Sequence, residues 1–212
     1  MAKEQNQIRE NASLYDEGAE ATGWFGPEVA FGLIYKFINP GQSILDIGIG
    51  TGLASELFRQ AELITHGMDI SPEMLDVCRS KGFDKLTGHS LLDIPFPYDS
   101  GSFDHIVCVG VMHFFLDLSK VFAESFRLLK SGGLFVFVTG DREKNEPMEV
   151  TVSEEHTETG QPVVFYLHTQ SEIQSWLDQY GFECLRELAF SINMDIEKKQ
   201  RFKARAYLVR KS

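Results

Sequence analysis

The stretch "SILDIGIGTGLASEL", residues 43–57, decides the fold, because an apolar run leads into three glycines at alternate positions and a helical pattern follows. Gly48, Gly50 and Gly52 let the backbone take conformations that other residues avoid and approach a ligand closely. The helix that follows offers unpaired N–H groups at its start. A strand, a glycine loop and a helix in this order predict a nucleotide-binding turn. A tight turn that needs glycine only for its dihedral angles is the plainer alternative.

Strand-like and helical patterns alternate along the rest of the chain. The length of 212 residues fits one ordinary domain, so we predict a single domain over residues 1–212. The alternation predicts an α/β fold, a Rossmann-like doubly wound sheet of seven mostly parallel strands with helices on both faces. The expected strands are 43–47, 63–69, 84–88, 102–110, 134–140, 182–190 and 201–210, and the expected helices are 27–38, 52–61, 72–81, 119–130 and 170–180.

The C-terminal part departs from this alternation in two ways. Residues 150–152 and 161–168 are expected to form a hairpin inserted after the fifth strand. The last two strands follow each other without a helix between them, so we expect them to be antiparallel.

Two helix starts carry specific capping signals. Ser71 before Pro72 predicts an N-cap followed by proline at the first helical position. Thr169 and Glu172 have the spacing of a capping box. These signals fix where two of the expected helices begin.

The charge balance limits the classes of partner. The net charge is −11, which argues against a protein that binds nucleic acid through its phosphate backbone, since such a protein needs a basic surface. The acidic residues concentrate in 141–158, a pattern typical of a solvated face that would also favour a cationic substrate. We therefore expect a small-molecule partner, no nucleic acid, and a monomer or weak homodimer.

The three cysteines, Cys78, Cys108 and Cys184, are far apart in the sequence and have no CxxC spacing. This pattern predicts reduced thiols in a cytoplasmic protein rather than a disulfide framework or a zinc site. The six histidines are also dispersed, so we expect no metal site. No apolar run approaches the roughly 20 residues of a membrane span, and we expect no membrane association.

Asp46 distinguishes between two nucleotide ligands. The dinucleotide fingerprint GxGxxG requires a third glycine where this chain has Leu53 or Ser55. A carboxylate beside the loop also repels a pyrophosphate, by about 4 kcal/mol for unit charges 4 Å apart at an effective dielectric constant near 20. S-adenosylmethionine instead carries an ammonium and a sulfonium group, which a carboxylate attracts directly or through water. The loop therefore suits a cationic adenosine ligand.

At this point the sequence resembles a known family over nearly its whole length. "ILDIGIGTG" (44–52) is similar to motif I of the class I S-adenosylmethionine-dependent methyltransferases, and 93–115 and 125–138 resemble later stretches of their small-molecule members. "LYDEGAE" (14–20) resembles the N-terminal segment that closes over the cofactor. The start "YD" together with "SPEML" resembles the Williams–Beuren-region group. The resemblance implies an N-terminal helical lid region over 1–40 and an acceptor region over 141–168.

The expected cofactor contacts are S-adenosylmethionine contacts, with S-adenosylhomocysteine as the product. Asp69 ends the second strand about 20 residues after the loop, where a carboxylate accepts hydrogen bonds from both ribose hydroxyls. Ile70 and Met74 are expected on the adenine faces, with ordinary core packing as the alternative. Relatives carry Gly-Asp-Ala after the third strand where this chain has "GHS". We favour His89 and Ser90 for the adenine edge and keep Asp93 as the alternative.

The fourth strand ends at Val109 and Gly110, whose carbonyls are expected to meet the methionine ammonium, and Tyr15 is expected to close over that end. His113 lies just beyond, where it could act as general base or orient the acceptor; a polar residue satisfied at a helix start is the alternative. Arg142, Tyr166 and His168 are expected near the acceptor. Phe114 and Phe115 are expected in the core, and a role in favouring an aromatic or apolar acceptor is the alternative.

The predicted function is methyl transfer to an oxygen, nitrogen or sulfur atom of a small molecule, mainly by in-line positioning. Two alternatives remain at this stage. The chain could be a non-catalytic adenosine-binding module that regulates a partner, or a dinucleotide-dependent oxidoreductase, which Asp46 and Leu53 disfavour.

Overall fold

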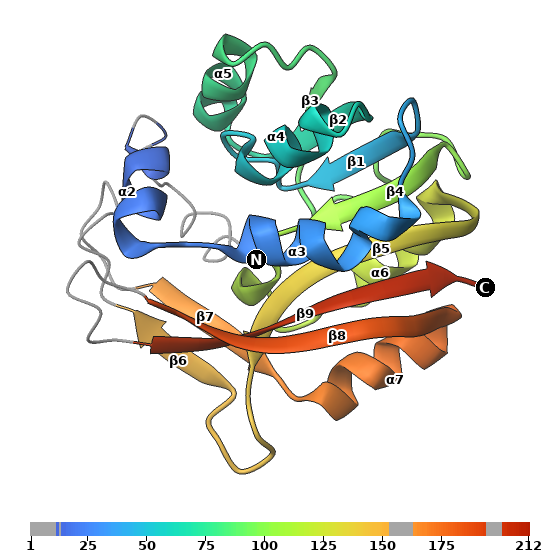
Figure 1. Cartoon of the computed structure of the whole chain (residues 1–212). Helices are drawn as coiled ribbons and strands as arrows, with labels where there is room; N and C mark the ends of the chain where they lie inside the picture. The colour runs from blue at the N-terminus through green and yellow to red at the C-terminus, as the bar shows by residue number, and fades with distance from the viewer. Residues whose placement is uncertain (1–11, 13, 153–162, 194–200) are drawn as a thin grey trace.

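The glycine-bearing stretch lies at the centre of the sheet in the computed structural model, which describes residues 12, 14–152, 163–193 and 201–212. β1 (Ser43–Ile47) is buried and pairs in parallel with β2 (Ile64–Asp69) on one side and β4 (Phe103–Cys108) on the other. α4 (Leu53–Gln60) begins directly after the loop. The strand arrowheads of β1 and β4 point to the same edge of the molecule (Figure 1).

The parallel part of the sheet has the order β3 (Leu86–Gly88), β2, β1, β4, β5 (Leu129–Asp141). β5 then pairs with β9 (Arg201–Lys211), which pairs with β8 (Phe182–Asn193), and both of these pairings are antiparallel. The predicted α/β class, the mostly parallel sheet and the antiparallel C-terminal pair are confirmed.

The inserted hairpin consists of β6 (Glu149–Val152) and β7 (Val163–His168), which pair in antiparallel fashion. The described residues form nine strands in one sheet rather than the predicted seven, because the end of β5 pairs with β7. Gly140 of β5 has Ala204 on one side and Leu167 of β7 on the other. β7 therefore pairs with β5 on the same side as β4 does, but nearer the carboxyl end of β5. The hairpin thus extends the sheet beyond the carboxyl end of β4.

Helices cover both faces of this sheet. Alternate residues of β5 point to opposite sides: Phe135 and Phe137 belong to the core cluster that includes α6 and α7 residues, and Val136 and Val138 belong to the one that includes α3 and α4 residues. The remaining elements are α2 (Tyr15–Thr22), α3 (Gly26–Ile34), the 3₁₀ turn η1 (Tyr35–Phe37), α5 (Pro72–Ser80), the 3₁₀ turn η2 (Met112–Phe114), α6 (Ser119–Leu128) and α7 (Gln170–Tyr180).

Both predicted caps are confirmed. The Ser71 hydroxyl accepts a hydrogen bond of 3.2 Å from the Met74 N–H at the start of α5. Thr169 and Glu172 form the capping box of α7, which ends at Gly181 in the left-handed conformation. The predicted helix 27–38 is α3 followed by η1, so its last turn is tighter than an α-helix. In the part of the chain that the structure describes, no helix has both the length and the apolar character that a bilayer crossing requires.

Candidate active site

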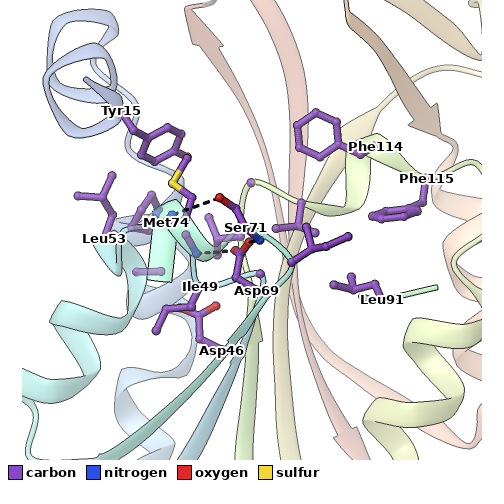
Figure 2. Close-up of a pocket in the computed structure, with 18 of the residues that line it drawn as sticks. Tyr15, Asp46, Ile49, Leu53, Asp69, Ser71, Met74, Leu91, Phe114 and Phe115 are labelled. Carbon is purple, nitrogen blue, oxygen red and sulfur yellow. Dashed lines mark hydrogen bonds between the residues drawn. The ribbon is translucent and has the colours of Figure 1, made fainter. Parts of the chain in front are cut away.

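A pocket lies at the carboxyl ends of β1, β2 and β4, where ligands bind in sheets of this type. Figure 2 shows Tyr15, Leu53 and Met74 on one side of it and Leu91, Phe114 and Phe115 on the other. α2, β6 and β7 lie at the same edge of the molecule (Figure 1). Of the residues predicted from the sequence, those that line the pocket are Tyr15, Asp46, Gly48, Gly50, Asp69, Ile70, Met74, Ser90, Val109 and Gly110.

The glycine loop depends on backbone conformations that favour glycine. Gly48, Gly50 and Gly52 have φ angles of +76°, +53° and +91°. A Cβ atom at Gly48 would lie 2.3 Å from Cγ2 of Val111, so the loops after β1 and β4 can approach only with glycine at this position. Gly52 does not line the pocket; a Cβ there would lie 2.8 Å from the Phe83 ring, so this glycine serves the packing of α4 beside α5.

Asp69 is bound to the backbone of two neighbouring segments. Its Oδ2 accepts a hydrogen bond of 2.8 Å from the Gly50 N–H, and its Oδ1 accepts one of 2.9 Å from the Ser71 N–H. Burial raises the pKa of this carboxyl above its usual range, and the backbone hydrogen bonds oppose that shift. Each oxygen keeps a second lone pair, so the carboxylate can still accept hydrogen bonds from a ligand.

Asp46 is almost fully buried, with 1% of its surface exposed, and its Oδ2 accepts a hydrogen bond of 2.8 Å from the Ser55 hydroxyl. Burial raises the pKa of Asp46 to about 7; the Ser55 hydroxyl opposes this shift and the charge of Asp69 adds to it. The carboxyl group is therefore poised between its two protonation states near neutral pH. A cation bound beside it would favour the charged form.

The segment after β3 contributes the backbone and side chains of Ser90, Leu91 and Leu92 to the pocket. His89 does not line it: its Nε2 donates a hydrogen bond of 2.8 Å to the Asp93 carbonyl, and its ring lies against Phe96. The sequence expectation for His89 therefore fails in geometry, because the imidazole is used to close its own turn. The Asp93 alternative also lies outside the pocket lining.

Tyr15 and the end of β4 meet across the pocket. Gly110 has a φ angle of +79°, and a Cβ atom there would come within 3.7 Å of the Tyr15 hydroxyl and within 3.9 Å of the Trp24 ring. The hydroxyl of the α2 tyrosine thus lies close to the backbone at the end of β4. These positions agree with the predicted placement of Tyr15 opposite Val109 and Gly110.

Beyond Val111 the lining is apolar. Phe115 belongs to the buried core and Phe114 packs against it, as expected, and both also reach the pocket with Leu91 and Leu92. Trp24 and Pro27 add further apolar surface. The charged side chains of the lining, Asp46 and Asp69, belong to the ends of β1 and β2. The pocket therefore carries its two carboxylates at the glycine-loop end, among apolar side chains such as Leu53 and Met74, and is apolar near η2.

His113 lies among aromatic rings rather than in the pocket lining. Its ring centroid is 4.3 Å from that of Phe114 and 4.2 Å from that of Phe165 in β7. Burial lowers the pKa of His113 to about 3, so the imidazole is neutral at physiological pH and a weak base. These aromatic neighbours suit a side chain that packs against Phe114 and holds it in position.

Arg142, Tyr166 and His168 also lie outside the pocket lining. Arg142 donates hydrogen bonds to the Leu167 carbonyl (3.0 Å) and to the Glu172 carboxylate (2.7 Å). His168 Nε2 donates to the Leu116 carbonyl (3.2 Å), which leaves Nδ1 to accept from the Thr139 hydroxyl (3.3 Å). These residues fasten the hairpin and the segment after η2 to the sheet.

Two of the four acids in the described part of the segment 141–158 form ion pairs with basic residues of β9. Asp141 pairs with Arg205 at 3.0 Å and Glu146 with Lys203 at 2.6 Å. Residues 153–162, which include part of the predicted hairpin and three of its acids, lie outside the described residues, as do 1–11 and 13 of the predicted lid. No group of three His, Cys, Asp or Glu side chains that could hold a metal ion occurs in the described ranges, and Cys78, Cys108 and Cys184 are free.

Sequence comparison identifies the segment that carries this pocket. Residues 45–137 match the sequence model of a family described as "Methyltransferase domain". The matched segment runs from β1 into β5 and includes the glycine loop, Asp69 and the end of β4.

Two relatives illustrate the range of similarity. A demethylmenaquinone methyltransferase of Tropheryma whipplei (strain Twist) is 32% identical over 102 residues, which cover 47% of this chain and 42% of that protein. The chain therefore spans less than half the length of this relative. A ubiquinone biosynthesis O-methyltransferase of Haemophilus ducreyi is 24% identical over 219 residues, which cover 91% of this chain and 92% of the relative.

The fold recurs in solved structures. An S-adenosylmethionine-dependent methyltransferase from Methanosarcina mazei superimposes with a TM-score of 0.71 at 17% sequence identity, covering 84% of this chain and 96% of the other. At this identity the comparison shows a shared fold. The finer resemblance to the Williams–Beuren-region group stays a prediction.

Proposed function

We propose that this chain is a class I S-adenosylmethionine-dependent methyltransferase and that it transfers the methyl group of S-adenosylmethionine to a small, uncharged and largely apolar acceptor. The observation that carries the proposal is the two-ended pocket. Carboxylates and a glycine loop build one end, and aromatic and aliphatic side chains build the other. A cationic adenosyl cofactor suits the first end and an apolar acceptor suits the second.

The polar end offers a partner for each part of the cofactor. Asp69, Ile70, Met74 and Ser90 all line the pocket. Asp69 would accept hydrogen bonds from the ribose hydroxyls, Ile70 and Met74 would pack on the adenine faces, and Ser90 would meet the adenine edge. Val109 and Gly110 line the pocket close to Tyr15, and their carbonyls would hold the methionine ammonium at this end. These assignments are proposals from position, and they leave His89 and Gly52 with structural roles.

The Asp46 carboxylate favours a cationic ligand over an anionic one. When bound, S-adenosylmethionine supplies a methyl group on a positively charged sulfur, and the departing thioether is neutral. A buried carboxyl with a pKa near 7 gains its charge when a cation binds and loses it when the site is vacated. A pyrophosphate at the same place would be repelled by the charged Asp46 carboxylate. Otherwise Asp46 would have to bind a proton before the pyrophosphate could bind. The dinucleotide alternative is disfavoured on this ground.

The chain's main contribution to the reaction is alignment. An in-line displacement at a good leaving group gains most from holding the two reacting atoms at the right distance and angle and from excluding water. Phe114, Phe115, Leu91 and Leu92 would do this by enclosing the apolar body of the acceptor. A general base is needed only when the acceptor atom must lose a proton. The general-base role of His113 stays a prediction. Burial argues against this role, because it lowers the pKa of the imidazole and makes it a weak base.

The acceptor class follows from the same lining. A cationic acceptor, which the acidic segment 141–158 suggested, is less favoured because Asp141 and Glu146 are already paired with Arg205 and Lys203. Two relatives are named as a demethylmenaquinone methyltransferase and a ubiquinone biosynthesis O-methyltransferase, and these names support a small-molecule acceptor for this chain. A cytoplasmic location, the absence of a nucleic-acid partner and the oligomeric state remain predictions from composition.

The test is a methyl-transfer screen with S-adenosylmethionine and acceptor pools sorted by charge. Neutral phenols, hydroquinones and thiols should yield S-adenosylhomocysteine, whereas amines that are cationic at neutral pH and carboxylic acids should not. Turnover confined to the cationic pool would refute the proposed acceptor class. S-adenosylhomocysteine binding without turnover on any pool would instead favour the non-catalytic adenosine-binding module.

A further inference from the structure

The N-terminal helix α2 contributes Tyr15 to the pocket wall although it buries none of its own residues. Apolar burial normally supplies most of the free energy that docks a helix onto a protein body, at about 25 cal/mol per Å². A helix without buried residues has little of this stabilisation. Polar contacts must therefore hold α2, and with it Tyr15, over the pocket.

Asp16 makes the polar contacts that join α2 to the pocket-forming elements. Its Oδ1 accepts a hydrogen bond of 2.6 Å from the Thr51 hydroxyl, and its Oδ2 accepts a short hydrogen bond from the Lys81 ammonium. Thr51 lies in the glycine loop, 35 residues from Asp16 along the chain, and Lys81 lies 65 residues away at the C-terminal end of α5. One carboxylate thus ties the lid helix to two other elements.

The Thr51 anchor is a buried group. Only 1% of Thr51 is exposed, so loss of its hydrogen-bond acceptor would leave a buried hydroxyl unpaired, which is costly. Thr51 is also adjacent to Gly50, whose N–H is held by Asp69. The position of the lid is therefore linked through two hydrogen bonds to the carboxylate that ends β2.

We propose that Asp16 is a positioning residue that latches α2 over the cofactor end of the pocket and so fixes Tyr15 opposite Gly110. This inference rests on the proposed function. The latch must open for the cofactor to exchange, since α2 carries part of the pocket wall. The two contacts differ in kind: the Thr51 hydrogen bond is shielded from solvent, whereas the Lys81 ion pair is partly exposed and sensitive to salt.

The test measures the dissociation rate of S-adenosylhomocysteine by the fluorescence of Trp24, which lines the pocket, in a Trp176→Phe background. Asp16→Ala should accelerate dissociation roughly three- to tenfold, the range given by one net hydrogen bond and one exposed ion pair. Glu17→Ala, which makes the same charge change at the next, exposed position of α2, is the matched control and should leave the rate unchanged.

Asp16→Asn separates the two contacts. The amide oxygen can still accept from Thr51, but the ion pair with Lys81 is lost. Between 50 and 500 mM salt the Debye length falls from about 14 Å to about 4 Å. The dissociation rate of the parent protein should rise over this range, and that of Asp16→Asn should become nearly independent of salt. A merely structural effect would not remove the salt dependence. Because the amide oxygen of Asp16→Asn still accepts from the buried Thr51 hydroxyl, this variant should keep the melting temperature of the parent.

The outcomes separate this inference from the function on which it rests. If the parent binds S-adenosylhomocysteine and Asp16→Ala dissociates at the rate of Glu17→Ala, the latch is wrong and the proposed function stands. If the parent does not bind S-adenosylhomocysteine at all, the proposed function fails, and the latch fails with it.

Discussion

The carboxylate of Asp69, at the end of β2, accepts a hydrogen bond of 2.8 Å from the backbone N–H of Gly50, in the loop that follows β1. A dashed line in Figure 2 marks this bond, and Asp69 also accepts a hydrogen bond from the Ser71 N–H. The acid that is proposed to bind ribose therefore also holds the glycine loop in place. Ligand binding and loop conformation should respond together to changes at this position.

Asp69→Ala should weaken S-adenosylhomocysteine binding by about 1.5–3 kcal/mol, the scale of hydrogen bonds to charged groups. Isothermal titration calorimetry measures this difference directly. Asp76→Ala is a suitable control, because Asp76 is an exposed acid of α5 that pairs with Arg79 at 2.5 Å. Equal affinities for Asp69→Ala and the parent protein would refute the ribose assignment.

The pKa of Asp46 leads to a prediction about stability and pH. Its folded-state pKa of about 7 is higher than the pKa of 3.8 of an unperturbed aspartic acid, so the folded state binds more protons than the unfolded state between these two values. The contribution of this group to the free energy of unfolding is complete below about pH 4 and is lost as pH rises through 7. The full loss is on the order of 4 kcal/mol, from about 1.4 kcal/mol per pKa unit.

Asp46→Asn should remove this pH dependence, because the amide has no charge to desolvate and its oxygen can still accept from Ser55. Urea unfolding at pH 5 and pH 8 should show the variant gaining stability relative to the parent at the higher pH. Asp84→Asn, at an exposed position, should leave the pH dependence as it is. An unchanged pH profile in Asp46→Asn would show that this carboxyl does not titrate in the fold.

Gly48→Ala tests the close approach of the loops after β1 and β4. The substitution forces a left-handed conformation on alanine and drives its Cβ against Val111, so it should lower the free energy of unfolding by about 2–4 kcal/mol. Gly32→Ala is the matched control: it lies in α3 with open space around it and should stabilise the protein by about 0.5–1 kcal/mol. Chemical denaturation of both variants decides whether the clash is real.

His113→Phe distinguishes a supporting ring from a general base. The ring contacts of His113 are aromatic and its pKa is about 3, so a phenyl group should keep the fold and leave turnover within about threefold of the parent. Loss of an acting general base typically lowers the rate by about 10²–10⁴-fold. A loss of that size, in a variant that melts at the parent's temperature, would restore the catalytic role that the sequence suggested.

The sequence predicted those features that have a local cause. Glycine spacing, the Ser71 and Thr169 caps and the alternation along β5 each act within a few residues, and the structure confirms the caps and the strands. The number of strands differed because pairing of Gly140 with Leu167 joins the hairpin to the main sheet. That contact depends on the path of the whole insertion and has no local signature.

The candidate site was predictable where a residue follows a strand, as Asp69 and Gly110 do. It was not predictable where an apolar side chain could serve either the core or the pocket. Phe114 and Phe115 follow His113 directly, yet the phenylalanines line the pocket and the histidine does not. Trp24 and Asp16 come from far away in the sequence, and only the folded position of α2 relates them to the site.

The most direct test of the account is calorimetric titration of the parent protein at pH 7 with S-adenosylmethionine and, separately, with NAD, in buffers that differ in ionisation enthalpy. We predict that S-adenosylmethionine binds with release of a proton, as Asp46 takes on its charge beside the cation, that this release disappears in Asp46→Asn, and that NAD does not bind. Binding of NAD in preference to S-adenosylmethionine would contradict the account.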